Sequence, residues 1–252
     1  MKRLTVAFIF AALAFTAPAH AETVNCTAIT SLPAIITVQG IYCFTGNLGT
    51  AITTGNAIDI QTSNVVLDLN GFKLGGLAAG LGTNALGIHA TNRQNITIRN
   101  GTVRGFFIGI RLEGIGPSGG HVVEEIRADQ NTLFGIDVNG SGNIVRNNQV
   151  VATGGSTAFG ANADANGIIV SGSGPRLLNN DVINTVKLGT GTASGIYINL
   201  VDGGLVVNNR ITGADVGVQF ANGSGNKYRD NLTSGVVTPF IPFGATDAGN
   251  NN

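Results

Sequence analysis

One short phrase recurs seven times along this chain of 252 residues, and it constrains the fold more than any other feature. Each copy alternates apolar and polar residues, as in Gly135-Ile136-Asp137-Val138, and successive copies lie roughly 22 to 32 residues apart. The copies begin at Ala57, Gly87, Gly109, Gly135, Gly167, Gly195 and Gly217. Alternation is typical of a strand with one buried face, and a recurring unit of this length is typical of a solenoid.

A second apolar segment follows each copy after a short turn, at residues 65–69, 96–98, 122–126, 144–145, 177–178 and 205–207, with a weaker version near Tyr228. An asparagine then recurs at Asn70, Asn100, Asn148, Asn180, Asn209 and Asn231, with Ala128 as the exception. Stacked turns would bring these amides about 4.8 Å apart, so that each donates to the carbonyl of the next. We interpret the column as structural. The alternative is that the row of asparagines binds a ligand. Because asparagine also tolerates the geometry of tight turns, the row does not require a ligand to explain it.

The order Gly-Ile-x-Val, then Asn-x-Ile/Val, then an Asn at a turn resembles the right-handed parallel β-helix repeats of the pectin-lyase-like superfamily, in its exported bacterial type. The resemblance covers residues 56 to about 234. It implies an all-β, single-stranded right-handed parallel β-helix of about seven rungs. We expect a signal peptide at residues 1–21, an N-terminal cap at 22–55, the β-helix at 56–235, and a C-terminal cap with a tail at 236–252. Within that tail, residues 245–252 are expected to be disordered.

The first 21 residues have the organisation of a secretory signal. Lys2 and Arg3 precede an apolar stretch, and Ala19-His20-Ala21 matches a small-residue cleavage site. The apolar stretch is too short to span a bilayer, which takes about 20 residues. We therefore expect a secreted or periplasmic protein that has no membrane contact after signal cleavage.

Cys26 and Cys43 are the only cysteines of the chain. In an oxidising compartment they are expected to form a disulfide. Two cysteines without a nearby pair of histidines make a poor zinc site, so we predict no metal site.

The chain carries 14 basic and 14 acidic residues, and its net charge is zero. No broad electrostatic field is expected to attract nucleic acid or anionic lipid, which argues against both as partners.

If the phrase is one strand of every turn, its outward residues form two columns on one sheet. The first column reads Asp59, His89, Arg111, Asp137, Ile169, Tyr197 and Gln219. The second reads Gln61, Thr91, Glu113, Asn139, Ser171, Asn199 and Ala221. Neighbours are expected about 4.8 Å apart within a column and about 7 Å apart along a strand.

This geometry places His89 beside Arg111, Arg111 beside Asp137, and Glu113 diagonal to both His89 and Asp137. We take these four residues as the candidate catalytic group, because titratable side chains gathered on one face are the usual mark of a site. Candidate substrate-binding residues on the same columns are Asp59, Asn139, Tyr197 and Asn199. The alternative is a solvated salt-bridge network that contributes about 0 to 1 kcal/mol.

The resemblance implies a polysaccharide or other glycan as the partner. We expect a lyase or hydrolase in which Asp137 and Glu113 act as acid and base or hold a cation, Arg111 binds a sugar carboxylate and His89 moves a proton. Carboxylates about 7 Å apart would suit an inverting hydrolysis. No cofactor is expected, except calcium in the case of a lyase. The Asn-Thr-Asp, Asp-Asp, Gly-His-Gly and Arg-Ile-Lys motifs of polygalacturonase-like hydrolases do not occur.

Two further readings remain open: a glycan-binding protein without catalysis, and a structural or adhesive rod. Long insertions at residues 75–86, 153–166 and 188–194 precede the repeated strand, and we expect them to border one edge of its sheet as the walls of a cleft. The tail segment Phe240-Ile241-Pro242-Phe243 is expected to pack over the last turn, or to form an oligomer contact.

Overall fold

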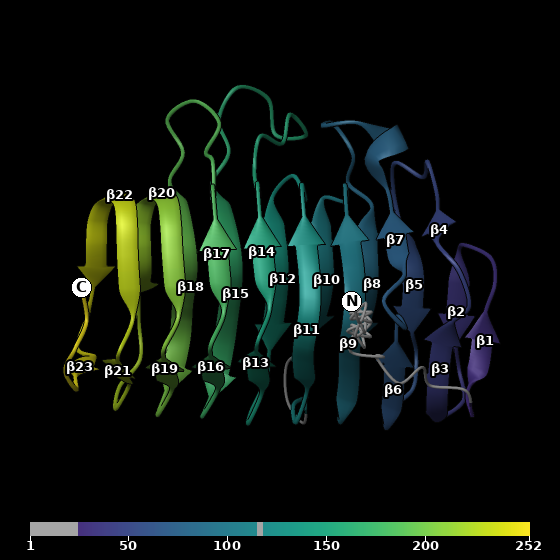
Figure 1. Cartoon of the computed structure of the whole chain (residues 1–252), viewed down its shortest axis with the longest axis horizontal. Helices are drawn as coiled ribbons and strands as arrows, with labels where there is room; N and C mark the ends of the chain where they lie inside the picture. The colour runs from purple at the N-terminus through teal and green to yellow at the C-terminus, as the bar shows by residue number, and fades with distance from the viewer. Residues whose placement is uncertain (1–24, 115–117) are drawn as a thin grey trace, which may run out of the picture.

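The computed structural model describes residues 25–114 and 118–252, so the predicted signal peptide lies outside the described residues. The chain is a right-handed parallel β-helix whose turns follow one another from the N-terminal to the C-terminal end (Figure 1). Its one helical segment within the described ranges is the short 3-10 helix η1 (Leu77–Ala79). No helix in those ranges is long and apolar enough to cross a membrane.

The repeated phrase forms the first sheet, in which every strand pairs in parallel with the strand one turn later. Its strands are β2 (Ala34–Ile36), β5 (Asn56–Ile60), β8 (Leu86–Thr91), β10 (Ile108–Glu113), β12 (Phe134–Asn139), β15 (Ala165–Ser173), β18 (Ala193–Asp202), and the ends of β20 (Arg210–Phe220) and β22 (Leu232–Ile241). The seven predicted strands are therefore extended by β2 before them and β22 after them.

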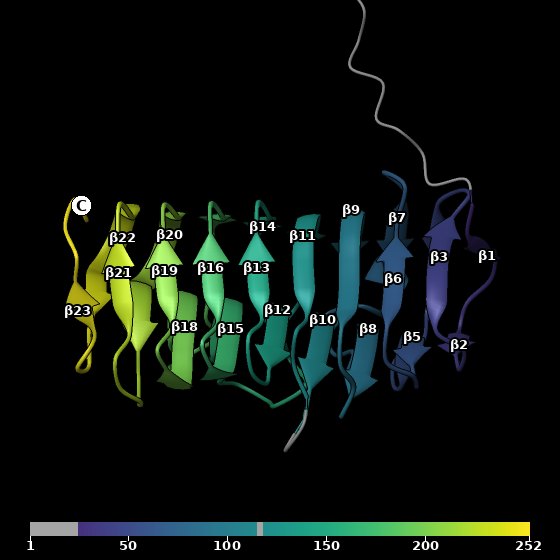
Figure 2. The ribbon, with the colours of Figure 1, turned by 90° about the horizontal axis from the view of Figure 1, so that it is seen from below.

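The second sheet contains the other predicted strand of each turn (Figure 2). It holds β1 (Thr27–Ile29), β3 (Gly40–Phe44), β6 (Val65–Asp68), the first parts of β9 (Ile96–Arg104) and β11 (Val122–Asp129), β13 (Ile144–Arg146), β16 (Arg176–Leu178), β19 (Leu205–Val207), β21 (Lys227–Arg229) and β23 (Thr246–Asp247).

A third sheet, which the sequence pattern does not predict, closes each turn. It consists of β4 (Leu48–Gly49), β7 (Lys73–Gly75), the later parts of β9 and β11, β14 (Gln149–Val151), β17 (Asp181–Ile183), and the first parts of β20 and β22.

The core is a stack of apolar side chains along the solenoid axis. On the first sheet Ile110 pairs with Ile88 on one side and with Ile136 on the other, which confirms the predicted register. The members of this column are all fully buried: Ile58, Ile88, Ile110, Ile136, Ile168, Ile196 and Val218. Each such residue contributes roughly 1.5 to 3 kcal/mol through burial.

The glycine that opens the phrase is required by the close approach of the next turn. A Cβ atom built on Gly135 would lie 2.6 Å from the carbonyl oxygen of Gly167, and one on Gly167 would lie 2.6 Å from that of Gly195. The same obstruction, at 2.3 to 2.9 Å from a backbone oxygen of the following turn, recurs at Gly87, Gly109, Gly195 and Gly217. Any side chain would displace that carbonyl.

A ladder of asparagines holds the corner between the second and third sheets, and it contains four of the six predicted members. It runs through Asn148, Asn180, Asn209, Asn231 and Asn251, and the Nδ2 atom of each of the first four lies 2.9 to 3.0 Å from the Oδ1 of the next member. Ile126 occupies the position one turn before Asn148, because its backbone N–H donates to Asn148 Oδ1 at 3.0 Å.

The predicted members Asn70 and Asn100 belong to a different position. They occupy the corner position one residue earlier, which is the position of Asn147 beside Asn148. The φ angles of Asn70 and Asn100 are 48° and 56°, and that of Asn147 is 55°. Asparagine tolerates this left-handed conformation better than most residues. The break in the ladder is therefore at Ile126 rather than at Ala128.

Both ends of the described chain are tied to neighbouring turns. Cys26 and Cys43 form the predicted disulfide, with their Cα atoms 5.8 Å apart. Residues 245–252, for which the sequence predicts disorder, are ordered in the structure: β23 pairs with β21, and Asn251 Oδ1 accepts from Asn231. Phe240 of the tail stacks on Tyr228 with ring centroids 5.4 Å apart, as expected for packing over the last turn.

Candidate functional site

The outward residues of the first sheet form the predicted first column. Asp59 pairs with His89, His89 with Arg111, and Arg111 with Asp137 in successive turns. Glu113 lies two residues after Arg111 on β10, opposite Thr91 of β8. The structure thus brings Asp59, His89, Arg111, Glu113 and Asp137 into one continuous charged row.

His89 is the centre of the first half of the row. Its Nδ1 atom lies 2.9 Å from Asp59 Oδ1, and its Nε2 atom lies 3.2 Å from Glu113 Oε1. The hydroxyl of Thr91 lies 3.0 Å from Nε2 and 3.3 Å from the same Glu113 oxygen. Both ring nitrogens therefore face a carboxylate, which fixes the plane of the imidazole.

Arg111 joins the two carboxyl groups of the second half. Its Nη2 atom lies 2.7 Å from Glu113 Oε2, and its Nε atom lies 3.4 Å from Asp137 Oδ2. The environments of the two acids differ: the side chain of Glu113 is 27% exposed and that of Asp137 only 6%. One residue thus faces the solvent while the other is enclosed.

Burial raises the pKa of Asp137 from 3.8 to about 7, against the opposing charge of Arg111 and with a further increase from Glu113. Its Oδ1 atom is buried and has no hydrogen-bond partner among the described residues. With a pKa of about 7, this carboxyl group is about half protonated at neutral pH, so a protonated form is available to act as a general acid.

Asp59 is held by three neighbours. Burial raises the pKa of Asp59, but hydrogen bonds from His89, Gln61 and Asn56 outweigh that effect and bring it below 3.8. Asn56 Nδ2 donates to Asp59 Oδ1 at 3.0 Å, and Gln61 Nε2 donates to Oδ2 at 2.7 Å. Asp59 therefore orients His89. Asn56 was not among the predicted site residues, since it precedes the repeated phrase.

A groove of about 580 Å³ runs beside the charged row, at the corner where the first sheet turns toward the second. Glu113 and Asn139 line it from the sheet, and Leu200 lies at its far end. The remaining lining residues are small or polar: Thr91, Asn92, Gly114, Gly140, Ser141, Ser171 and Gly172. Leu200 belongs to a bulge in which β18 gains one residue relative to β15, between the pairs Val170–Ile198 and Gly172–Val201.

The three insertions lie together along the opposite edge of the first sheet (Figure 1). Thr157 N donates to Leu81 O at 3.1 Å, which joins the first and second insertions, and Ala163 pairs with Leu188, which joins the second and third. They border one edge as predicted. They do not wall the groove at Glu113 and Asn139, because that groove is formed at the other edge by the turns after the strands.

The remaining predicted residues lie farther from the charged row. Ile169 separates Asp137 from Tyr197 in the first column, so Tyr197 is two turns away. Asn199 accepts a hydrogen bond from Asn222 Nδ2 at 3.3 Å. Among residues 25–114 and 118–252, no three His, Cys, Asp or Glu side chains are grouped as ligands of a metal ion.

No protein-family model matches the sequence, and no curated protein matches it. Among solved structures, the Dettilon tailspike protein is similar at a TM-score of 0.52 and 13% identity, over 89% of this chain and 59% of the tailspike. ORF18 of Geobacillus virus E2 is similar at a TM-score of 0.53 and 11% identity, over 89% of this chain and 52% of that protein.

A third match is the catalytic domain of a GH87 α-1,3-glucanase in complex with tetrasaccharides, at a TM-score of 0.42, 13% identity, and coverage of 90% and 64%. The chain spans less than two thirds of the length of all three. At these identities the likeness to the first two shows the β-helix fold alone.

Proposed function

We propose that this chain is an exported protein that binds polysaccharide on the outer face of the first sheet. The groove of about 580 Å³ beside the charged row carries this proposal, since it combines an open, elongated surface with convergent amide, hydroxyl and carboxylate groups. The Cys26–Cys43 disulfide supports an oxidising compartment outside the cytoplasm.

The proposal includes cleavage of the bound chain, with the buried carboxyl of Asp137 as its main support. Asp137, with its pKa raised to about 7, gives its proton to the glycosidic oxygen as the bond to the anomeric carbon breaks. Glu113 takes a proton from the attacking water, which forms the new bond at the same carbon. Arg111 contacts both acids and holds them in position.

Binding without turnover is the second candidate. The observation that favours it is that every ionisable side chain of the row already has an acidic or basic partner within 3.4 Å. Such a row can be a stable polar platform for sugar hydroxyl groups rather than a set of reactive groups.

A glycan array followed by an assay of released reducing ends tests both candidates. We expect the wild-type protein to bind and cleave one polysaccharide, and Asp137→Asn and Glu113→Gln to lose at least about a hundredfold in turnover while they still bind. Glu124→Gln is the matched control, because Glu124 pairs with Arg146 on another face.

The outcomes separate the candidates. Binding without any released ends would reduce the function to glycan binding, and binding to no glycan would leave the structural rod. Unsaturated product ends that require added calcium would identify a lyase in place of a hydrolase.

A further inference from the structure

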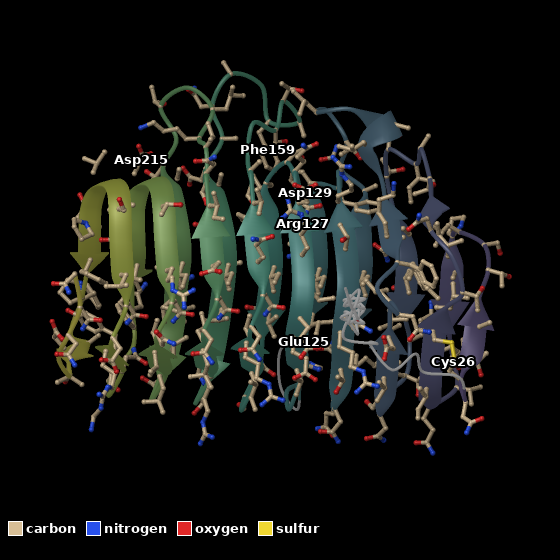
Figure 3. All side chains as sticks on the ribbon, viewed as in Figure 1. Cys26, Glu125, Arg127, Asp129, Phe159 and Asp215 are labelled. Atoms are coloured by element: carbon tan, nitrogen blue, oxygen red, sulfur yellow. A yellow bond between two sulfur atoms is a disulfide. The ribbon has the colours of Figure 1, made fainter. Side chains whose placement is uncertain are left out.

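The insertions form a second hollow, of about 570 Å³, at the edge of the first sheet away from the groove. Phe159 is its most exposed aromatic residue, with 63% of its surface accessible (Figure 3). The ring makes a T-shaped contact with Phe107, with the ring centroids 5.5 Å apart. A largely exposed aromatic ring is a platform for a flat apolar surface.

Beside the apolar side chains of Leu133, Phe134 and Ala163, this hollow contains polar groups that hydrogen bonds hold in place. Asn162 Oδ1 accepts from the backbone N–H of Thr190 at 2.8 Å and from its hydroxyl at 3.0 Å. Asp164 Oδ1 accepts from Thr192 N at 2.7 Å. An aromatic face next to amide, hydroxyl and carboxylate groups matches a pyranose ring, which has an apolar C–H face and hydroxyl groups around its rim.

Strand β12 connects the two hollows. Phe134, its first residue, lines the hollow of the insertions, and Asn139, its last residue, lines the groove. Asp137 lies between them. The five-residue step from Phe134 to Asn139 corresponds to about 17 Å of extended chain, longer than a single sugar ring.

Within the first column, the direction along the solenoid axis presents fewer polar side chains beyond Asp137. On the turn after Asp137 the first column continues with Ile169, and only the turn after that presents Tyr197. In the described chain the charged row therefore ends at Asp137 on this side.

We infer that the bound glycan crosses the solenoid along β12, from a stacking subsite at Phe159 over Asp137 to the groove at Glu113 and Asn139. This inference rests on the proposed function and adds the path of the ligand. An axial path, parallel to the stack of turns, would instead use Tyr197 as its aromatic contact.

Calorimetric titration with oligosaccharides of increasing length, cut from the polysaccharide that the array identifies, tests the path. We expect Phe159→Ala to weaken binding of the long oligomers roughly three- to twelvefold, the magnitude of an aromatic contact, and to leave the shortest bound oligomer unchanged. Phe159→Tyr should retain wild-type affinity. Tyr197→Ala, the matched control for the axial path, should stay within about twofold of wild type.

Equal affinity of Phe159→Ala and wild type for all lengths would overturn the transverse path, and so would a loss caused by Tyr197→Ala. A circular dichroism melting curve for each variant separates lost contacts from lost fold. A wild-type protein that binds no glycan would overturn the proposed function itself, which is a different result from intact binding that ignores Phe159.

Discussion

Replacing Asp137 by asparagine should abolish the loss of stability that this residue causes as the pH rises from about 4 to about 7, while it removes the proposed acid. The folded-state pKa of Asp137 is raised from 3.8 to about 7, so between these values the folded chain holds a proton that the unfolded chain has released. Stability therefore falls as the pH rises through this range and is constant above it. This increase in pKa corresponds to a loss of at most about 4 kcal/mol in the free energy of unfolding, at about 1.36 kcal/mol for each pKa unit.

The assay is urea unfolding of both proteins between pH 4 and pH 8.5, with the disulfide intact. His121 has the opposite effect in the wild type, because burial lowers its pKa from 6.5 to about 4 and stability falls as the pH drops through that range. Both proteins carry His121, so its contribution cancels in the difference between them. Any constant cost of the new amide cancels in the pH dependence as well.

We expect the free energy of unfolding of Asp137→Asn, relative to wild type, to rise by about 2 to 4 kcal/mol from pH 4 to pH 8. A carbon-13 NMR titration of the Asp137 carboxyl, assigned by its absence in the variant, measures the pKa directly. Parallel stability curves for the two proteins, or a carboxyl that titrates near 4, would refute the argument that burial sets the state of this acid.

Three further predictions concern the scaffold, and urea unfolding at pH 7 measures each. Asn180→Ala should lower the free energy of unfolding by about 3 kcal/mol, because it leaves the buried N–H groups of Asn148 without their acceptor. Asn179→Gly, at the exposed neighbouring position, should lower it by less than about 1 kcal/mol. Similar losses for the two variants would contradict a role of the buried ladder. Gly167→Ala should lower the free energy of unfolding by about 2 kcal/mol or more, since its Cβ would lie 2.4 Å from Val182 Cγ1. An unchanged free energy of unfolding would contradict the tight approach of the turns. Cys26→Ser should lower the free energy of unfolding by about 3 kcal/mol, and reduction of the wild-type disulfide should have the same effect. A variant as stable as the oxidised wild type would show that the disulfide does not stabilise the fold.

The first sheet could be predicted because its strands have a buried side chain at every second position, as Ile110 and Leu112 do. The second sheet could be predicted because an apolar segment recurs after each copy of the phrase. The third sheet could not. Its strands β14 and β17 have three residues each and bury only the central one, Val150 or Val182. A segment of that length is too short to show an alternating pattern.

The neighbours in the charged row follow from the register alone, which is why His89, Arg111 and Asp137 could be placed together. The contrast between the buried Asp137 and the partly exposed Glu113 could not be predicted, since it depends on the packing around each side chain. The hollow at Phe159 was also missed, because an insertion has no periodicity that shows which of its residues face solvent. Two of the six predicted ladder members, Asn70 and Asn100, were wrong, because they lie one corner position before Asn148 and spacing does not resolve that difference.

The column of glycines has a consequence for how this molecule can change in length. A shift of one residue between two coils would bring a side chain against a carbonyl oxygen and would turn the buried isoleucines outward. Complete coils, each with its own glycine, meet neither obstacle and contact only the coils above and below them. Duplicating or deleting a whole coil would therefore lengthen or shorten the outer face of the first sheet in increments of about 4.8 Å, and no smaller increment fits.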